Sequence, residues 1–306
     1  MKNQPDNPLS LGEGNTPLLR FFCLEKKLSW QGELWAKCEY QNPTGSFKDR
    51  GSIVEVTEAL VQNKTGTICA STGNMAASLA AYTTKAKLSC FVVVPSQTPE
   101  AKLHQALMCG ANLIKINGGY DDCVQKAITL AKQKKLLLCG DYELRRKGQQ
   151  TISTELADSG INFDTFIVPI GNGTLGCAIA EGFSKFNKYP QFIGVQGIGA
   201  DPIYRAWKNK REIISIKNPK TIASAMKVGN PLDGNLTLEW IKKTGGAMYA
   251  VNAQEIKNAQ TLLAKTEGIF VETTGAATVA CVTKIENPKN QKIVLILTGS
   301  GLKEIS

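Results

Sequence analysis

The fold that we expect for this chain is indicated most clearly by the stretch TFIVPIGNGTLGCAIAEGFSKF, residues 165–186. It begins with the apolar run TFIVPI, passes through a turn that contains three glycines, and continues as CAIAEGFSKF, whose apolar residues suit a helix. An apolar strand that turns directly into a helix is typical of a sheet covered by helices. This interpretation predicts the same pattern on both sides of the stretch.

The pattern recurs along most of the chain. Apolar runs of four to seven residues alternate with segments of helical period, which indicates parallel strands with helices on both faces of the sheet. The expected strands are residues 33–39, 67–70, 88–94, 111–116, 136–139, 165–170, 192–196 and 292–297. Residues 208–235 fit neither period and are expected to form an irregular excursion over the surface.

The composition limits the class of protein. With 306 residues, 42% of them hydrophobic, the chain can bury a substantial core in two medium domains or one large domain. No apolar run is long enough to span a bilayer and the N-terminus lacks the apolar core of a secretory signal, so we expect a cytoplasmic protein without a membrane partner. Nine scattered cysteines without a C-x-x-C pair are expected to be reduced, mainly buried thiols.

Histidine content and charge exclude further classes. The single histidine, His104, cannot build a multi-histidine metal site, and we expect no metal. The formal charge of +10 comes from lysine-rich patches such as residues 132–135 and 145–147, with neither a nucleic-acid motif nor interleaved aromatic residues. A small anionic substrate is therefore a more economical expectation than a nucleic acid.

Three of the expected strands end in turns of small polar residues, at 71–74, 171–176 and 298–301. In an open parallel sheet, ligands collect at the carboxyl ends of strands, where free backbone N–H groups are available. We expect all three turns to open on the same edge. The turn at 171–176 is the strongest anion site, because a glycine-rich turn followed by a helix aims several N–H groups at one point. It also matches G-x-G-x-x-G, so a dinucleotide site stays open as an alternative.

The stretch NPTGSFKDRG, residues 42–51, places Lys48 at the start of an expected helix. Ser46 can cap this helix and Asp49 can complete a capping box, while Ile53, Val56, Leu60 and Val61 form its apolar face. The positive end of the helix dipole disfavours an ammonium group and favours the neutral amine that forms an imine with an aldehyde. Taken singly, Lys48 could be an ordinary surface lysine. An imine-forming lysine together with a phosphate-binding turn is what pyridoxal phosphate (PLP) requires.

Six motifs then carry a resemblance to a known family. They are NPTGSFKDRG (42–51), ASTGNMAASLAAY (70–82), VPIGNGTLG (168–176), TIASAMKVGNP (221–231), EGIFVETTGAATVA (267–280) and LTGSGLK (297–303). In this order they resemble the PLP enzymes of fold type II, the tryptophan synthase β-chain type, and most closely the threonine synthase family. The resemblance extends from about residue 14 to residue 303.

The resemblance implies an α/β fold with two open, mainly parallel twisted sheets, helices on both faces of each, and the cofactor in the cleft between two domains. It implies a large domain of residues 1–45 and 146–306 that binds the PLP phosphate. A smaller domain, residues 46–145, would carry the STGN loop. A homodimer is also implied.

The resemblance also assigns roles to single residues. Lys48 would hold PLP as an imine and act as the proton-transfer base, Asn74 would bind the phenolic oxygen, and Thr298 would face the pyridine nitrogen. The PLP phosphate would be bound by Gly171, Asn172, Gly173, Thr174 and Leu175. The substrate carboxylate would lie at Ser71, Thr72 and Gly73, and the substrate phosphate at Arg145 and Arg146, with Lys147 as a third candidate.

The implied reaction converts O-phospho-L-homoserine and water to L-threonine and phosphate. The chain departs from the family in reading GNGTLG for GNAGN, ETTGAAT for EPASAA, and GDYELRRKGQQ before the family's GQ-x-T motif. These differences put the identity of the substrate in doubt more than the cofactor. A serine or threonine dehydratase and a β-replacing cysteine or cysteate synthase therefore remain alternatives. A dinucleotide-binding module without imine chemistry is the alternative outside enzymes.

Overall fold

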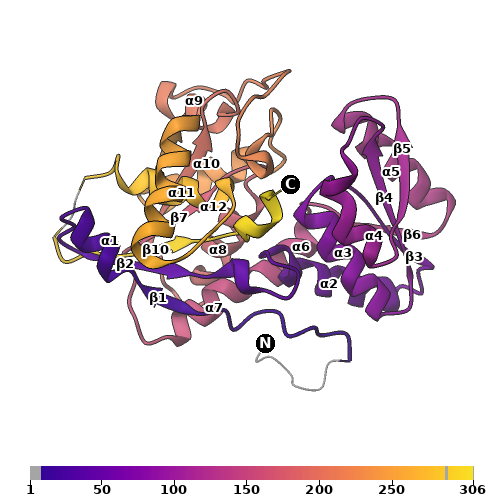
Figure 1. The fold of residues 1–306 in the computed structure, drawn as a ribbon, viewed down its shortest axis with the longest axis horizontal. Helices are drawn as coiled ribbons and strands as arrows, with labels where there is room; N and C mark the ends of the chain where they lie inside the picture. Colours follow the sequence, from indigo (N-terminus) through magenta and orange to yellow (C-terminus); the bar gives the residue numbers. More distant parts are fainter. Residues whose placement is uncertain (1–7, 287–288, 306) are drawn as a thin grey trace. The chain divides into compact units, whose positions relative to one another are not determined.

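The computed structural model describes residues 8–286 and 289–305, which form two compact units (Figure 1). The first unit contains residues 8–14 and 42–149, and the second contains residues 15–41 and 150–305 except 287 and 288. The borders expected from the sequence were 45/46 and 145/146, with the N-terminal residues in the large domain. Among the described residues, no helix has the length and apolarity needed to cross a membrane.

The first unit is built on a four-stranded, fully parallel sheet with the strand order β5-β4-β3-β6. Its strands are β3 (Gly66–Ala70), β4 (Ser89–Pro95), β5 (Asn112–Ile116) and β6 (Leu136–Leu138). Its helices are α2 (Lys48–Val61), α3 (Asn74–Lys85), α4 (His104–Met108), α5 (Tyr120–Gln133) and α6 (Glu143–Gln149), with a short 3₁₀ helix η2 (Glu100–Leu103). Every residue of β3 is buried, as expected for a central strand covered on both faces.

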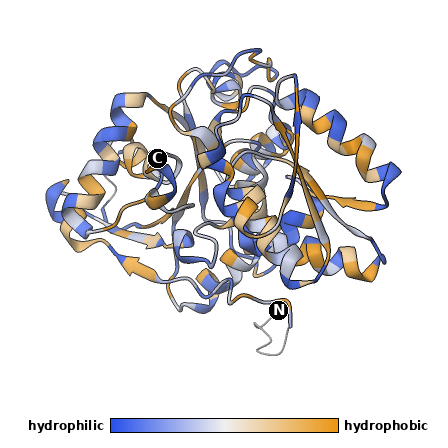
Figure 2. Cartoon of the chain, turned by 45° about the vertical axis from the view of Figure 1, so that its right-hand side comes forward, coloured by the Kyte–Doolittle hydropathy of each residue, from blue (hydrophilic) through white to orange (hydrophobic). Residues whose placement is uncertain are grey.

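The two faces of this sheet supply two separate cores. Along a strand, side chains alternate between the faces. Cys69 of β3 and Val92 of β4 therefore pack with α2 and α3, whereas Ile68 and Val93 pack with α5. Helices in Figure 2 alternate between hydrophilic and hydrophobic residues along their length, which is the pattern of helices that bury one face.

The second unit is built on a six-stranded sheet with the order β1-β2-β10-β7-β8-β9, in which only β1 runs antiparallel to its neighbour. Its strands are β1 (Leu18–Arg20), β2 (Glu33–Lys37), β7 (Thr165–Pro169), β8 (Gln191–Gly197), β9 (Ala247–Val251) and β10 (Lys292–Ile296). Its α-helices are α1 (Phe22–Lys27), α7 (Thr151–Asp158), α8 (Thr174–Ser184), α9 (Pro202–Asn209), α10 (Gly234–Lys243), α11 (Ala253–Glu267) and α12 (Thr273–Val282). Its 3₁₀ helices are η1 (Glu39–Gln41), η3 (Ser224–Met226) and η4 (Gly301–Glu304). Helix α12 packs on β7, β8, β9 and β10 and is covered in turn by α11.

The expected strands are present, and the expected fold class is confirmed. Two further strands, β1 and β9, escaped the prediction because both lie at sheet edges and neither is fully buried, so their apolar patterns are weak. Residues 210–233 contain one short 3₁₀ helix, η3, which confirms the irregular excursion.

The prediction that three glycine turns share one edge is wrong for one of them. Strands β7 and β10 are parallel neighbours, so the turns at 171–176 and 298–301 do open on one edge of the six-stranded sheet. The turn at 71–74 follows β3, which belongs to the other sheet. Alternating strands and helices do not reveal which strands share a sheet.

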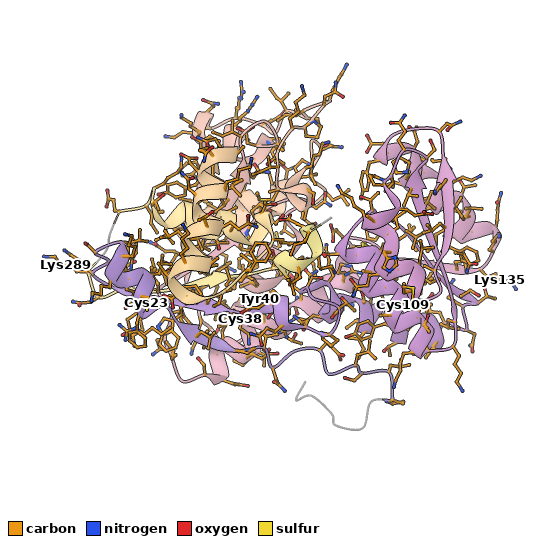
Figure 3. All side chains as sticks on the ribbon, in the orientation of Figure 1. Cys23, Cys38, Tyr40, Cys109, Lys135 and Lys289 are labelled. Atoms are coloured by element: carbon orange, nitrogen blue, oxygen red, sulfur yellow. The ribbon has the colours of Figure 1, made fainter. Side chains whose placement is uncertain are left out.

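All nine cysteines are free thiols, and seven are buried. Cys23 is exposed and Cys109 is partly exposed; both are labelled in Figure 3. Burial is the main reason that the pKa of several of these thiols is raised, and for Cys90 it reaches about 11. The interpretation of the cysteines as mainly buried thiols is confirmed.

Candidate active site

Lys48 is the first residue of α2, as the sequence predicted, but the helix is not capped as predicted. The residue before the helix is Phe47, and no side chain among the described residues caps the helix end. Asp49 accepts a hydrogen bond of 2.7 Å from the backbone N–H of Thr44, and Ser46 Oγ is fully buried without a hydrogen-bond partner among the described residues. The capping box is therefore wrong, because the Asp49 carboxylate fastens the turn that precedes the helix instead.

The buried face of α2 also differs from the expected apolar face. Val56 is buried, but Leu60 and Val61 are 41% and 70% exposed. Their place is taken by polar side chains, and Ser52 and Glu55 are 0% and 2% exposed. A helix can bury polar side chains only when they find partners, so this face must form a hydrogen-bonded network.

An anionic partner lies at the Lys48 amine. Lys48 Nζ is 2.8 Å from Asp141 Oδ1, and both side chains are largely buried. Asp141 follows β6 just as Ser71 follows β3, and these two strands are parallel neighbours with Ile68 opposite Leu138. The turn that carries Asp141 and the STGN turn therefore lie at the same edge of the four-stranded sheet.

The STGN turn at this edge leaves open space. Helix α3 begins at Asn74, and the Gly73 N–H donates to Ser71 Oγ at 3.3 Å. Thr72 lies between them, half-buried. Gly73 is exposed, and a Cβ atom added to it would meet no heavy atom within 4 Å. The described part of the chain therefore gives no steric reason for a glycine there.

Arg145 and Arg146, the expected substrate-phosphate contacts, differ in their surroundings. Arg145 has no exposed surface and forms a buried ion pair with Glu55. Arg146 is half-buried, and the neighbouring Lys147 is exposed with an i,i+4 ion pair of 3.4 Å to Glu143. Burial raises the pKa of the Glu55 carboxyl, whereas the Arg145 charge and the Gly140 N–H act in the opposite direction.

The 171–175 turn in the second unit joins β7 to α8. Gly173 has φ +96°, a left-handed conformation that favours glycine, and a Cβ atom there would lie 2.3 Å from Thr237 Oγ1. The neighbouring Asn172 carbonyl accepts a hydrogen bond of 2.9 Å from the Asp233 N–H. The turn is thus fixed against residues at the start of α10.

This turn has the features of a phosphate site. The first helical hydrogen bond runs from the Cys177 N–H to the Gly173 carbonyl at 3.0 Å, so the N–H groups of Thr174 and Leu175 precede any intrahelical acceptor. Thr174 Oγ1 is buried, with the residue 3% exposed, and has no hydrogen-bond partner among the described residues. A buried hydroxyl without a partner is costly unless a ligand satisfies it. The phosphate of PLP fits this group of donors.

Thr298 lies in the neighbouring turn at the same sheet edge. It is 1% exposed, and its hydroxyl donates a hydrogen bond of 3.2 Å to Glu272 Oε1. The Glu272 N–H in turn donates to the Gly299 carbonyl at 2.9 Å. The carboxylate of Glu272 therefore holds the orientation of Thr298.

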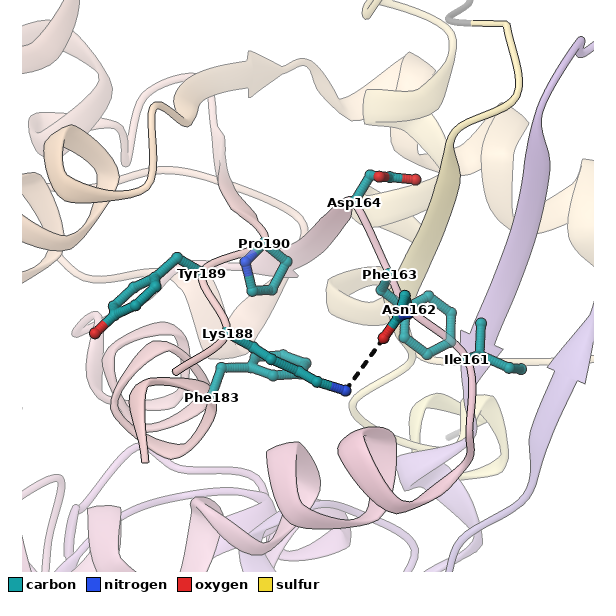
Figure 4. A pocket seen from close by; sticks show the side chains of 8 residues that line it. All are labelled: Ile161, Asn162, Phe163, Asp164, Phe183, Lys188, Tyr189 and Pro190. Atoms are coloured by element: carbon teal, nitrogen blue, oxygen red, sulfur yellow. Dashed lines mark hydrogen bonds between the residues drawn. The ribbon is translucent and has the colours of Figure 1, made fainter. Parts of the chain in front are cut away.

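A hollow on the second unit lies away from these turns. It is lined by residues 161–164, Phe183 and residues 188–190, and Lys188 donates to Asn162 at 3.2 Å across it (Figure 4). These residues precede β7 and β8, so the hollow lies at the amino ends of the strands. The glycine turns lie at the opposite, carboxyl ends, where ligands of open parallel sheets bind.

Sequence reasoning missed three residues of these sites: Asp141, Glu55 and Glu272. The signal for Asp141 was present, since it is the first charged residue after an apolar strand. Glu55 lies mid-helix and Glu272 in a motif that was recognised only as a whole, so neither carried a signal of its own.

Comparison with known proteins agrees with this chemistry. The model of the family "Pyridoxal-phosphate dependent enzyme" matches residues 9–299. The chain is 41% identical to a threonine synthase of Methanocaldococcus jannaschii over 97% of this chain and 76% of that protein. It is 38% identical to one of Methanosarcina acetivorans over 97% of this chain and 77% of that protein. A structure of maize serine racemase, 22% identical, shares the fold with a TM-score of 0.84 over 94% of this chain and 88% of that one. From the family match and these identities, the chain belongs to the pyridoxal-phosphate dependent enzymes.

Proposed function

We propose that this PLP enzyme is a threonine synthase, which converts O-phospho-L-homoserine and water to L-threonine and phosphate. The similarity to the two threonine synthases over nearly the whole chain supports this substrate. The observation that carries the cofactor side of the proposal is the 171–175 turn, where the buried Thr174 hydroxyl and free helix-end N–H groups match a phosphate.

Several residues hold the cofactor in this proposal. Lys48 would hold the aldehyde carbon of PLP covalently, Asn74 would bind its phenolic oxygen, and Thr298, oriented by Glu272, would hold its ring nitrogen. The residues that bind the phosphate are Gly171, Asn172, Gly173, Thr174 and Leu175. Bound PLP supplies an electron sink that acidifies the Cα–H bond of an attached amino acid.

The chain's own residues then bind the substrate and move protons. Ser71, Thr72 and Gly73 receive the substrate carboxylate in the open space beside Gly73. The Lys48 amine would be the base that removes the Cα proton of the bound amino acid. We assign the substrate phosphate to Arg146, because the donors of Arg145 are engaged inside the first unit.

The test is to assay products and the covalent link together. Purified protein should be yellow, release phosphate and form threonine from O-phospho-L-homoserine. The Lys48→Ala variant should lose the visible absorbance, the borohydride-trapped adduct and the activity by at least about a thousandfold. Release of a 2-oxo acid from serine or threonine without phosphate would instead indicate a dehydratase. A colourless protein that does not bind added PLP but binds NAD would indicate the dinucleotide-binding alternative.

The resemblance to the threonine synthase family also leads us to propose a homodimer that works in the cytoplasm. Light scattering after size-exclusion chromatography measures the mass of the assembly, and a monomer at micromolar concentration would contradict the proposal. Fractionation of the source cells, followed by detection of the chain, tests the location.

A further inference from the structure

The strongest unexplained feature of the first unit is the buried Arg145–Glu55 ion pair, which contacts the backbone of Lys48. Arg145 is 0% exposed and Glu55 is 2% exposed, and the sequence did not predict that these two side chains would be buried together. Burying two charges costs several kcal/mol of desolvation for each ion, by order of magnitude, and hydrogen bonds to other groups must offset part of this cost. The groups that the pair binds therefore indicate what it does.

The hydrogen bonds of this pair lead to the backbone of Lys48, to the backbone of Gly140 next to Asp141, and to a side chain of α2. Arg145 Nη1 donates to the Lys48 carbonyl at 3.1 Å, and Arg145 Nε donates to the Gly140 carbonyl at 3.2 Å. The Gly140 N–H donates to Glu55 Oε1 at 3.0 Å. The pair thus binds the backbone N–H and the carbonyl of Gly140, the residue before Asp141, and the carbonyl of Lys48.

The packing around Arg145 leaves it little freedom. A Cβ atom at Gly51 would lie 2.5 Å from Arg145 Cγ, so the arginine stem lies directly on the α2 backbone. Its Nη2 atom also reaches Ser52 Oγ at 3.4 Å, and Ser52 accepts from Ser78 at 2.7 Å. A planar guanidinium whose three nitrogens are engaged in this way is rigidly held.

We propose that Asp141 is a positioning residue for the Lys48 amine, and that the buried Arg145–Glu55 pair fixes both ends of the Lys48–Asp141 ion pair. Whenever Lys48 is not linked to the cofactor, the Asp141 carboxylate holds its amine at one place through the 2.8 Å contact. The same contact holds the proton that Lys48 has taken from Cα. This inference rests on the proposed role of Lys48 and adds to it the residues that aim the amine.

The first experiment measures covalent attachment of PLP to the apoprotein as a function of pH, by visible absorbance and by mass spectrometry after borohydride reduction. Asp141→Asn removes a negative charge that lies 2.8 Å from the amine, so the midpoint of attachment should move to lower pH by about one unit. Asp141→Glu should restore most of the original midpoint. Glu143→Gln removes the same charge from an exposed residue of the same segment and should leave the midpoint unchanged.

The outcomes distinguish a failure of the proposed function from a failure of the role proposed for Asp141. If the wild-type protein attaches no PLP at Lys48, the proposed function itself fails. If the wild type attaches PLP and Asp141→Asn has the same midpoint as Glu143→Gln, the proposed function stands and the role of Asp141 is overturned.

The second experiment tests whether the Arg145–Glu55 pair fixes the Lys48–Asp141 ion pair. It uses Arg145→Lys, which keeps a positive charge beside Glu55 but loses the planar guanidinium group. PLP attachment and kcat should each fall by about tenfold, while KM for O-phospho-L-homoserine changes less than about twofold. A large rise in KM with normal PLP attachment would mean that Arg145 binds the substrate phosphate, and would contradict the fixing role of the Arg145–Glu55 pair. Arg146→Lys is the matched variant, and its effect should fall on KM.

Discussion

The two glycine turns, at 71–74 in the first unit and at 171–175 in the second, look alike in sequence and differ in physical cause. At Gly173 the protein itself requires glycine, because φ is +96° and a Cβ atom would collide with Thr237. At Gly73 the described residues impose no such requirement, since nothing lies within 4 Å of an added Cβ. The fold requires Gly173, whereas Gly73 leaves open space, where we propose that the substrate carboxylate binds.

The largest expected effect is on Gly173. Gly173→Ala combines a left-handed conformation that is unfavourable for alanine with a steric clash, and should lower the free energy of unfolding by about 3 kcal/mol. Chemical denaturation of the apoprotein measures this loss. Gly245→Ala is the matched control, because Gly245 also has positive φ, +64°, but has open space around it. Equal losses in the two variants would show that the clash contributes nothing.

A smaller effect is expected at Thr174, in the same turn. Thr174→Val keeps the shape of the side chain and removes the hydroxyl, so the PLP dissociation constant should rise about tenfold through loss of one hydrogen bond to a charged group. The free energy of unfolding of the apoprotein should stay the same or increase, since the hydroxyl has no partner there among the described residues. Thr174→Ser should restore the affinity. Loss of apoprotein stability with unchanged PLP affinity would contradict a phosphate contact.

Of the two glycine substitutions, the smaller change in stability is expected at Gly73. Gly73 has a negative φ, −145°, and an added Cβ would meet no heavy atom within 4 Å, so Gly73→Ala should change the free energy of unfolding by less than about 1 kcal/mol. The added methyl group occupies the space that we propose for the substrate carboxylate, so KM should rise about tenfold while PLP affinity is preserved. A normal KM would remove the difference between the two turns, because neither glycine would then leave room for a substrate.

The sequence predicted most of the fold, because buried parallel strands appear as short apolar runs whichever sheet they join. It also predicted a glycine turn between a strand and a helix at 171–176, because the glycines and the following helix are local features. Asp141 is the first charged residue after an apolar strand, but it was missed because its place at the same sheet edge as the STGN turn depends on the pairing of β3 with β6, which local patterns do not contain. Glu55 was missed for another reason: helical period predicts an apolar buried face, and here a buried arginine satisfies a carboxylate on that face.

The strand order of the second unit has a consequence for how the chain reaches its native state. Strand β2, residues 33–37, is hydrogen-bonded to β10, residues 292–296, so these partners are separated by almost the whole sequence. Most of the first unit, residues 42–149, is continuous and complete long before β10 leaves the ribosome. Pairings between distant segments form slowly because a long loop must close first. During synthesis, the edge of β2 that pairs with β10 therefore stays unpaired until β10 has been made. In this interval the exposed strand edge is most prone to aggregation, and a chaperone would have its largest effect.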